Sequence, residues 1–231
     1  FDPQADKLAF EDMLSLDRWA VARALELQQE ITAAYKEFNF HLIHHKLSQF
    51  CTIDMGSFYL DIIKDRQYTS KTDSIARRSA QTALYHIAEA LCRWIAPILT
   101  FTSDELWQAI PGKRSESVLL ENWYDGLEPL AADEHMNMGF WHCILEVRAA
   151  VSKVLEALRA DKTIGSSLDA DVTLYVDAEL KTLLDSLGDE LRFVLITSEA
   201  QVKLLDEADG GCIEATACDR SIHIKAVPSQ A

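Results

Sequence analysis

The sequence predicts a mainly α-helical protein, an antiparallel helical bundle followed by a small α+β module. Long stretches place apolar residues three or four positions apart, which is the period of one buried helix face. Only 8 Gly and 5 Pro occur among the 231 residues, too few for a fold dense in turns. Near its end the chain changes to strict alternation, with Ile222 and Ile224 separated by His223, which is typical of a half-buried strand.

The helical bundle is predicted to span residues 1–139. Apolar faces predict helices over 16–38, 40–66, 73–96 and about 103–110, then a long loop over 111–132. In the second of these helices the apolar spacing lengthens to five between Phe50 and Met55, so we expect a bend or break near Gly56. Thr102 and Glu105 have the spacing of a capping box, which predicts the start of the fourth helix.

The remaining residues, 140–231, are predicted to form a linking helix and a small α+β module. The linking helix is expected over about 134–161, with the acidic pair Asp133 and Glu134 at its start, where the helix dipole favours negative charge. Strands are expected over 172–176, 192–197, 201–205, 212–217 and 221–227, with a short helix over 178–187. We expect the last strands to pair as an antiparallel ladder.

Composition and charge exclude several classes of protein. The formal net charge of −15 argues against binding nucleic acid by bulk charge, although a local cationic face remains compatible with it. The longest nearly apolar stretch, residues 94–101, is far shorter than the roughly 18 residues of a membrane helix. Five Cys without CxxC pairs predict reduced thiols and a cytoplasmic location. Because the chain begins at Phe1, we interpret it as a piece of a longer protein.

Local motifs for catalysis or cofactor binding are weak. The sequence contains neither GxxxxGK[ST] nor GxGxxG, the loops that bind phosphates, and no GxSxG. His41 and His45 are spaced to share a metal, with His44 beside them, but the glutamate of HExxH is missing. We therefore favour a polar helix face over a metal site, and predict no catalytic residue and no metal ligand.

Cationic residues gather in three places with aromatic residues between them, including Tyr59, Tyr68 and Tyr85. Arg and Lys on phosphates together with bases stacked on aromatic rings are the usual means of binding folded RNA loops. Solvated helix ends would give the same pattern. The candidate RNA-binding residues, chosen from charge and position, are Lys64, Arg66, Lys71, Arg77 and Arg78, and the pair Lys113–Arg114 forms the third group.

Five segments of the sequence resemble a known family. They are Leu16–Ala20 (LDRWA), Phe50–Arg66 (FCTIDMGSFYLDIIKDR), Thr102–Trp107 (TSDELW), Glu116–Val118 (ESV) and Lys162–Leu168 (KTIGSSL). Together they resemble the class I aminoacyl-tRNA synthetases of the isoleucine, valine, leucine and methionine group, and most specifically its bacterial isoleucyl-tRNA synthetase branch. The resemblance covers essentially the whole chain.

The resemblance implies the anticodon-binding C-terminal region of a cytoplasmic ligase that joins isoleucine to its tRNA with ATP. The catalytic signatures HIGH and KMSKS are missing from the sequence, so we expect the fragment to be inactive alone. No cofactor is expected here; ATP with Mg²⁺ would bind the parent's catalytic domain, and zinc a module that would follow. The implied partners are isoleucine tRNA and the remaining domains of the parent, and no membrane.

Other roles remain open at this point. An acidic helical protein-interaction scaffold is the main alternative, and a His-based metalloenzyme is a weaker one. The Asp17–Arg18–Trp19 segment is predicted to be structural, as a helix start and a core anchor, rather than a tRNA contact.

Overall fold

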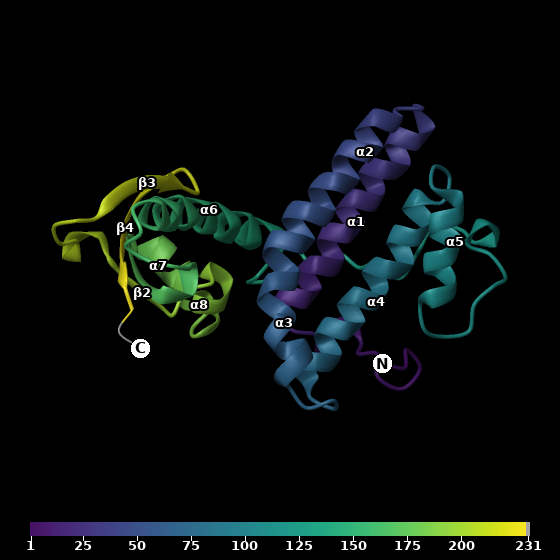
Figure 1. Ribbon diagram of the computed structural model, residues 1–231, viewed down its shortest axis with the longest axis horizontal. Helices are drawn as coiled ribbons and strands as arrows, with labels where there is room; N and C mark the ends of the chain where they lie inside the picture. The colour runs from purple at the N-terminus through teal and green to yellow at the C-terminus, as the bar shows by residue number, and fades with distance from the viewer. Residues whose placement is uncertain (230–231) are drawn as a thin grey trace. The chain divides into compact units, whose positions relative to one another are not determined.

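The computed structural model describes residues 1–229 and divides the chain into two compact units, residues 1–138 and 139–231. The first unit is a helical bundle and the second combines helices with a small sheet, so the predicted fold class is confirmed (Figure 1). Among the described residues, no helix is both long and apolar enough to span a membrane.

The bundle is built from five α-helices and one π-helical segment. Their bounds are α1 (Ser15–Lys36), α2 (Phe40–Gln49), η2 (Phe50–Tyr59), α3 (Leu60–Thr69), α4 (Ile75–Ile95) and α5 (Thr100–Ala109), with short 3₁₀ turns η1 (Phe10–Asp12) and η3 (Val118–Leu120). Helices α1 and α4 pack on each other, and α2, η2 and α3 follow one another as a single rod beside them (Figure 1). The core contains T-shaped aromatic pairs, Trp19 with Phe58 and Phe50 with Trp94, all four buried.

The expected bend near Gly56 is instead a continuous π-helix. A π-helix closes its hydrogen bonds over five residues, which matches the five-residue step between the buried Phe50 and Met55. A Cβ atom on Gly56 would lie 3.0 Å from the Cys51 carbonyl oxygen, closer than ordinary packing permits. Gly56 therefore permits the wider turn rather than ending the helix.

Two predicted helix starts are wrong. Helix α5 begins at Thr100 after Leu99, so Thr102 lies inside the helix and forms no capping box with Glu105. Helix α6 (Met138–Ala160) begins after the acidic pair predicted to open it, and Glu134 forms an ion pair with Arg18 of α1 instead.

The second unit holds a four-stranded sheet in the order β2-β1-β4-β3. Its elements are η4 (Ser167–Asp169), β1 (Ala170–Val176), α7 (Ala178–Asp185), α8 (Glu190–Leu195), β2 (Glu199–Leu204), η5 (Leu205–Glu207), β3 (Ile213–Ala217) and β4 (Arg220–Pro228). Strand β4 pairs antiparallel with β1 and β3, which confirms the expected antiparallel pairing of the last strands, and β1 and β2 pair in parallel. Alternate residues such as Leu174 and Ile224 are buried, and they pair across β1 and β4.

The strand predicted over residues 192–197 is wrong. These residues belong mostly to α8, which buries Leu191, Val194 and Leu195. That spacing of three and then one is helical, but the run of apolar β-branched residues resembles a strand. The helix ends where Ile196 adopts a left-handed backbone conformation, with φ of 57°.

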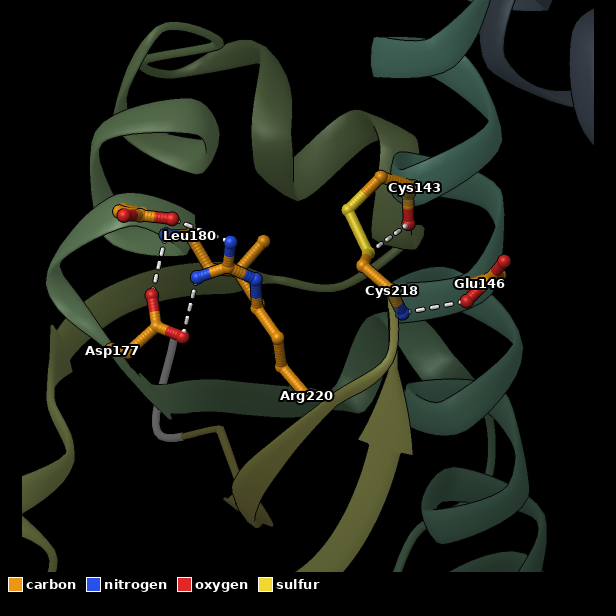
Figure 2. Close-up of a disulfide and its surroundings, with 7 residues drawn as sticks. Cys143, Glu146, Asp177, Leu180, Cys218 and Arg220 are labelled. Atoms are coloured by element: carbon orange, nitrogen blue, oxygen red, sulfur yellow. Dashed lines mark hydrogen bonds and ion pairs between the residues drawn. A yellow bond between two sulfur atoms is a disulfide. The ribbon is translucent and has the colours of Figure 1, made fainter.

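The expectation of five reduced thiols is wrong for one pair. Cys143 on α6 and Cys218 in the β3–β4 turn form a disulfide whose Cα atoms are 5.2 Å apart (Figure 2). The two residues are 75 positions apart in the sequence, so no local motif could predict their pairing. Cys51, Cys92 and Cys212 are free thiols.

Candidate nucleic-acid interface

Four of the five candidate cations flank or lie within the turn that joins α3 to α4, and Lys64 lies two residues before Arg66 on α3. We call residues 64–78 the α3–α4 edge. Helix α3 ends at Thr69, and Ser74 starts α4 because its hydroxyl accepts a hydrogen bond from the Arg77 backbone N–H at 3.3 Å. This cap fixes the direction in which the chain leaves the turn.

Lys64, Tyr68 and Lys71 give the edge an exposed cationic and aromatic surface. Lys64 and Tyr68 are four residues apart on α3 and therefore share a helix face. The Tyr68 side chain is 86% exposed, and Lys71 is exposed in the turn that follows. Lys64 Nζ contacts Asp61 Oδ1 at 2.8 Å, but a pair this exposed contributes little and yields readily to a phosphate. The arrangement can stack an unpaired base on a ring beside two ammonium groups.

Arg66 faces the interior of the bundle. Its Nη1 lies 3.8 Å from Oδ2 of Asp17, a carboxylate that is fully buried at the start of α1. Asp17 also accepts hydrogen bonds from the hydroxyls of Tyr59 and Ser79. Burial, followed by the Asp17 charge, raises the pKa of Tyr59 well above its usual range. This position of Arg66 supports the expected structural role of Asp17 and gives Arg66 a part in the same network.

Arg77 and Arg78 both donate hydrogen bonds to backbone carbonyl groups. Arg77 Nη1 donates to the Ser70 carbonyl oxygen at 3.2 Å and so ties α4 to the turn before it. Arg78 Nε donates to the Asp6 carbonyl oxygen at 2.9 Å, which fastens the N-terminal segment across α4. Arg77 also lines a hollow of about 280 Å³ that Asp6 shares. Their contact with RNA stays a prediction, whereas these structural contacts are present in the folded chain.

The third cationic group, Lys113 and Arg114, divides into an exposed and a buried residue. Arg114 is buried, with its guanidinium carbon 4.4 Å above the Trp107 ring and Nη2 2.6 Å from Glu89 Oε1. Arg93 reaches the other Glu89 oxygen, Oε2, at 2.6 Å. Hydrogen bonds from these arginines lower the pKa of Glu89, although burial alone would raise it. The cluster organises the loop over 111–132 rather than an RNA surface.

The histidines of α2 lie on its exposed surface. His41, His44 and His45 are all exposed. Within the part of the chain that the structure describes, no three His, Cys, Asp or Glu side chains are placed to hold a metal ion.

The choice of candidates by charge leaves out Tyr68, the most exposed aromatic side chain of the edge. Two features of the sequence point to Tyr68: it lies four residues after Lys64, and the residues that follow it are polar, so they offer its ring no apolar surface to pack against. Phe101 is equally exposed, so exposure alone does not select Tyr68, but Tyr68 lies between Lys64 and Lys71 in the sequence. We therefore include Tyr68 in the candidate interface.

This helical bundle with a cationic, aromatic edge is the kind of fold found in a tRNA-binding module, and comparison with known proteins shows its family. Residues 17–174 match the anticodon-binding domain of tRNA ligases. The chain belongs to that family.

Curated relatives of the chain carry the name of one particular tRNA ligase, isoleucine–tRNA ligase. The isoleucine–tRNA ligase of Serratia proteamaculans is 60% identical over 208 residues, which cover 90% of this chain and 22% of that protein. The isoleucine–tRNA ligase of Shewanella pealeana is 53% identical over 225 residues, 97% of this chain and 24% of that protein. A Marinomonas isoleucine–tRNA ligase is 52% identical over a similar range. The chain thus spans about a quarter of the length of these relatives.

Proposed function

We propose that this chain docks the anticodon stem and loop of isoleucine tRNA, with the α3–α4 edge as a contact surface. The observation that carries the proposal is the exposed Tyr68 between Lys64 and Lys71, in a chain of the anticodon-binding family. Lys64 and Lys71 would contact backbone phosphates, and the Tyr68 ring would stack on an unpaired base. Arg66, Arg77 and Arg78 would hold the edge in shape.

The net charge of −15 is compatible with an acidic protein body that carries cations at the α3–α4 edge. An acidic body repels RNA except where cations are concentrated, so it favours one orientation of the tRNA over others. Affinity through a few phosphate contacts is also sensitive to salt, because each contact releases counterions. This predicts selective binding of moderate strength rather than general adhesion to RNA.

The parent protein would be a cytoplasmic isoleucine–tRNA ligase, and the rest of that synthetase would be the chain's protein partner. In this proposal ATP with Mg²⁺ and the zinc belong to parts of the parent outside this chain. The chain alone would hold tRNA without activating isoleucine. ATP–pyrophosphate exchange assayed with the purified chain tests this statement, and exchange above background would contradict it.

The docking function is tested by titrating the chain with an isoleucine tRNA transcript and with the same transcript carrying a changed anticodon. We expect tighter binding of the native transcript and weaker binding of both at higher salt. Equal affinity for the two transcripts would contradict anticodon docking. Binding of a basic peptide with no binding of either tRNA would favour the acidic scaffold instead.

A further inference from the structure

The disulfide of the second unit joins two elements that other contacts already hold together. Cys218 and Asp219 form the two-residue turn between β3 and β4, both with left-handed backbone conformations at φ of 55° and 58°. Ala217 and Arg220 pair on either side of the turn, which makes this the hairpin geometry in which two central residues adopt positive φ. The backbone of the hairpin therefore presents Cys218 toward α6 in a defined position.

Two polar contacts anchor this turn independently of the sulfur atoms. The Cys218 backbone N–H donates to Oε2 of Glu146, one turn beyond Cys143 on α6, at 2.6 Å (Figure 2). On the other side, Arg220 Nη1 donates to Asp177 Oδ2 at 2.7 Å (Figure 2). Asp177 is itself fixed because its other oxygen caps α7 through the Leu180 N–H at 2.8 Å. We expect these contacts to keep the two cysteines close when the bond between them is broken.

Both sulfur-bearing residues are half-buried rather than enclosed. Cys143 and Cys218 each keep part of their surface in contact with solvent, unlike a structural bridge in a sealed core. A small thiol or disulfide can approach them without unfolding the unit, and access of this kind governs the rate of exchange.

We propose that Cys143 and Cys218 are a reversible thiol–disulfide exchange site whose co-reactant is a low-molecular-weight disulfide such as oxidised glutathione. One cysteine thiolate attacks the small disulfide, forms a mixed disulfide and expels one thiolate. The second cysteine thiolate then attacks the protein sulfur of that mixed disulfide and expels the other thiolate. Two electrons pass from the protein to the small molecule, whose two thiolates take up the two protons given up by the cysteine thiols and leave as two thiols. A small dithiol reverses both steps.

The remaining cysteines do not compete for this pairing within the chain's second unit. Cys212 lies at the opposite end of β3 from Cys218, roughly 20 Å away at the rise of an extended strand. A disulfide requires Cα atoms within roughly 7 Å, so Cys212 cannot replace Cys218 as the partner of Cys143. In the first unit, Cys92 is buried, and burial raises the pKa of its thiol to about 11. Within the second unit, the geometry thus directs oxidation to one pair.

Closing the bond would lock the β3–β4 hairpin onto α6. The cross-link joins residues 75 positions apart, and constraint of so long a loop in the unfolded chain is strongly stabilising. We expect oxidation to raise the melting temperature of this unit by about 10 °C. The unit would then exist in a looser dithiol form and a rigid disulfide form, according to the thiol balance around it.

The test equilibrates the whole 231-residue chain in glutathione buffers of increasing oxidised fraction, followed by acid quenching, alkylation and peptide mass spectrometry. We expect one disulfide, Cys143–Cys218, to form in oxidising buffer and to disappear in reducing buffer. Circular dichroism should show a folded chain at both ends of the series. The melting shift should vanish in Cys143→Ser and in Cys218→Ser and persist in the matched double variant Cys51→Ser/Cys212→Ser.

Several results would overturn the proposal. A reduced chain whose second unit is unfolded would make the bridge an obligatory structural bond. A pair that stays reduced throughout the series, stops at a mixed disulfide, or joins other cysteines would exclude the exchange site. A melting shift that survives in both Ser variants would assign the effect to another residue.

Discussion

The Tyr59 hydroxyl donates a hydrogen bond to Asp17 Oδ1 at 2.7 Å, and both side chains are fully buried. Asp17 is a charged group taken out of water, so its hydrogen bonds determine whether the start of α1 is stable. Ser79 of α4 and Arg66 of α3 complete the surroundings of the carboxylate. This buried network joins α1, η2, α3 and α4, and the α3–α4 edge lies next to it.

Removing the hydroxyl tests the network. Tyr59→Phe should lower the free energy of unfolding by about 2 kcal/mol, because a buried carboxylate loses one donor. Urea unfolding at neutral pH measures the change. Tyr68→Phe is the matched control, since that ring is 86% exposed, and it should alter stability by less than about 0.5 kcal/mol. Equal effects of the two substitutions on stability would show that the Tyr59 hydrogen bond to Asp17 does not stabilise the fold.

The pH dependence of stability should report on His86. Burial lowers the pKa of His86 from 6.5 to about 4, the Lys7 charge adds to this, and Glu89 opposes it. Between these two pH values the unfolded chain binds a proton that the folded chain does not, so stability falls as the pH falls. The full stability is present above pH 6.5, where His86 is neutral in both states, and the loss reaches at most about 3 kcal/mol near pH 4.

The measurement for His86 is urea unfolding at several pH values between neutral and about 4. In His86→Gln the decline in stability over this window should be shallower than in the parent chain, whatever the variant's stability at neutral pH. A Gln side chain can still contact the Tyr124 hydroxyl, which lies 2.7 Å from His86 Nδ1. Parallel curves for the two proteins would assign the acid sensitivity to other groups.

Arg114 should be required for the loop over residues 111–132. Arg114→Ala leaves Glu89 with one charged partner fewer in a buried site, and we expect a loss of about 3 kcal/mol. Limited proteolysis should also cut the loop faster. Lys113→Ala removes the same charge from the adjacent exposed position and should change neither result. Identical behaviour of the two variants would mean that the pair with Glu89 does not hold the loop.

Phe38 occupies a position that suits glycine. It follows the end of α1 with φ of 55°, and its side chain is 76% exposed. A residue with a Cβ atom is strained there, so Phe38→Gly should raise stability by about 0.5–1 kcal/mol. Lys36→Gly, inside the last turn of α1, should instead lower it by about 1 kcal/mol. Thermal unfolding distinguishes these signs, and destabilisation by both would show that the Phe38 ring contributes more than its exposure suggests.

Much of the bundle could be predicted from helical periodicity, because each long helix buries one continuous face. The π-helix also leaves a signal in the sequence, because the five-residue step between Phe50 and Met55 equals its hydrogen-bond spacing. The same step is compatible with a bend, which is what we predict from the sequence. The strand predicted over 192–197 failed because short apolar runs fit both periods. Only the tertiary packing that buries Val194 and Leu195 on one side decides between them.

The site was less predictable than the fold. Charge and sequence position place Lys64, Arg66 and Lys71 near one another along the chain, but they do not show that Arg66 faces the buried Asp17. The same limit applies to Arg114, whose partner Glu89 is 25 residues away. A cation's role depends on which carboxylate or carbonyl the fold brings near it, and that information is not local.

The central claim is that the α3–α4 edge contacts tRNA through Lys64 and Lys71 beside Tyr68. The measurement is the salt dependence of isoleucine tRNA affinity for the parent chain, for Lys64→Ala/Lys71→Ala, and for the control Lys36→Ala/Lys113→Ala with the same net charge. We expect the edge variant to bind about tenfold more weakly or worse, and its log–log salt slope to fall by about 2, while the control matches the parent. Equal affinities and slopes for the two double variants would contradict the account.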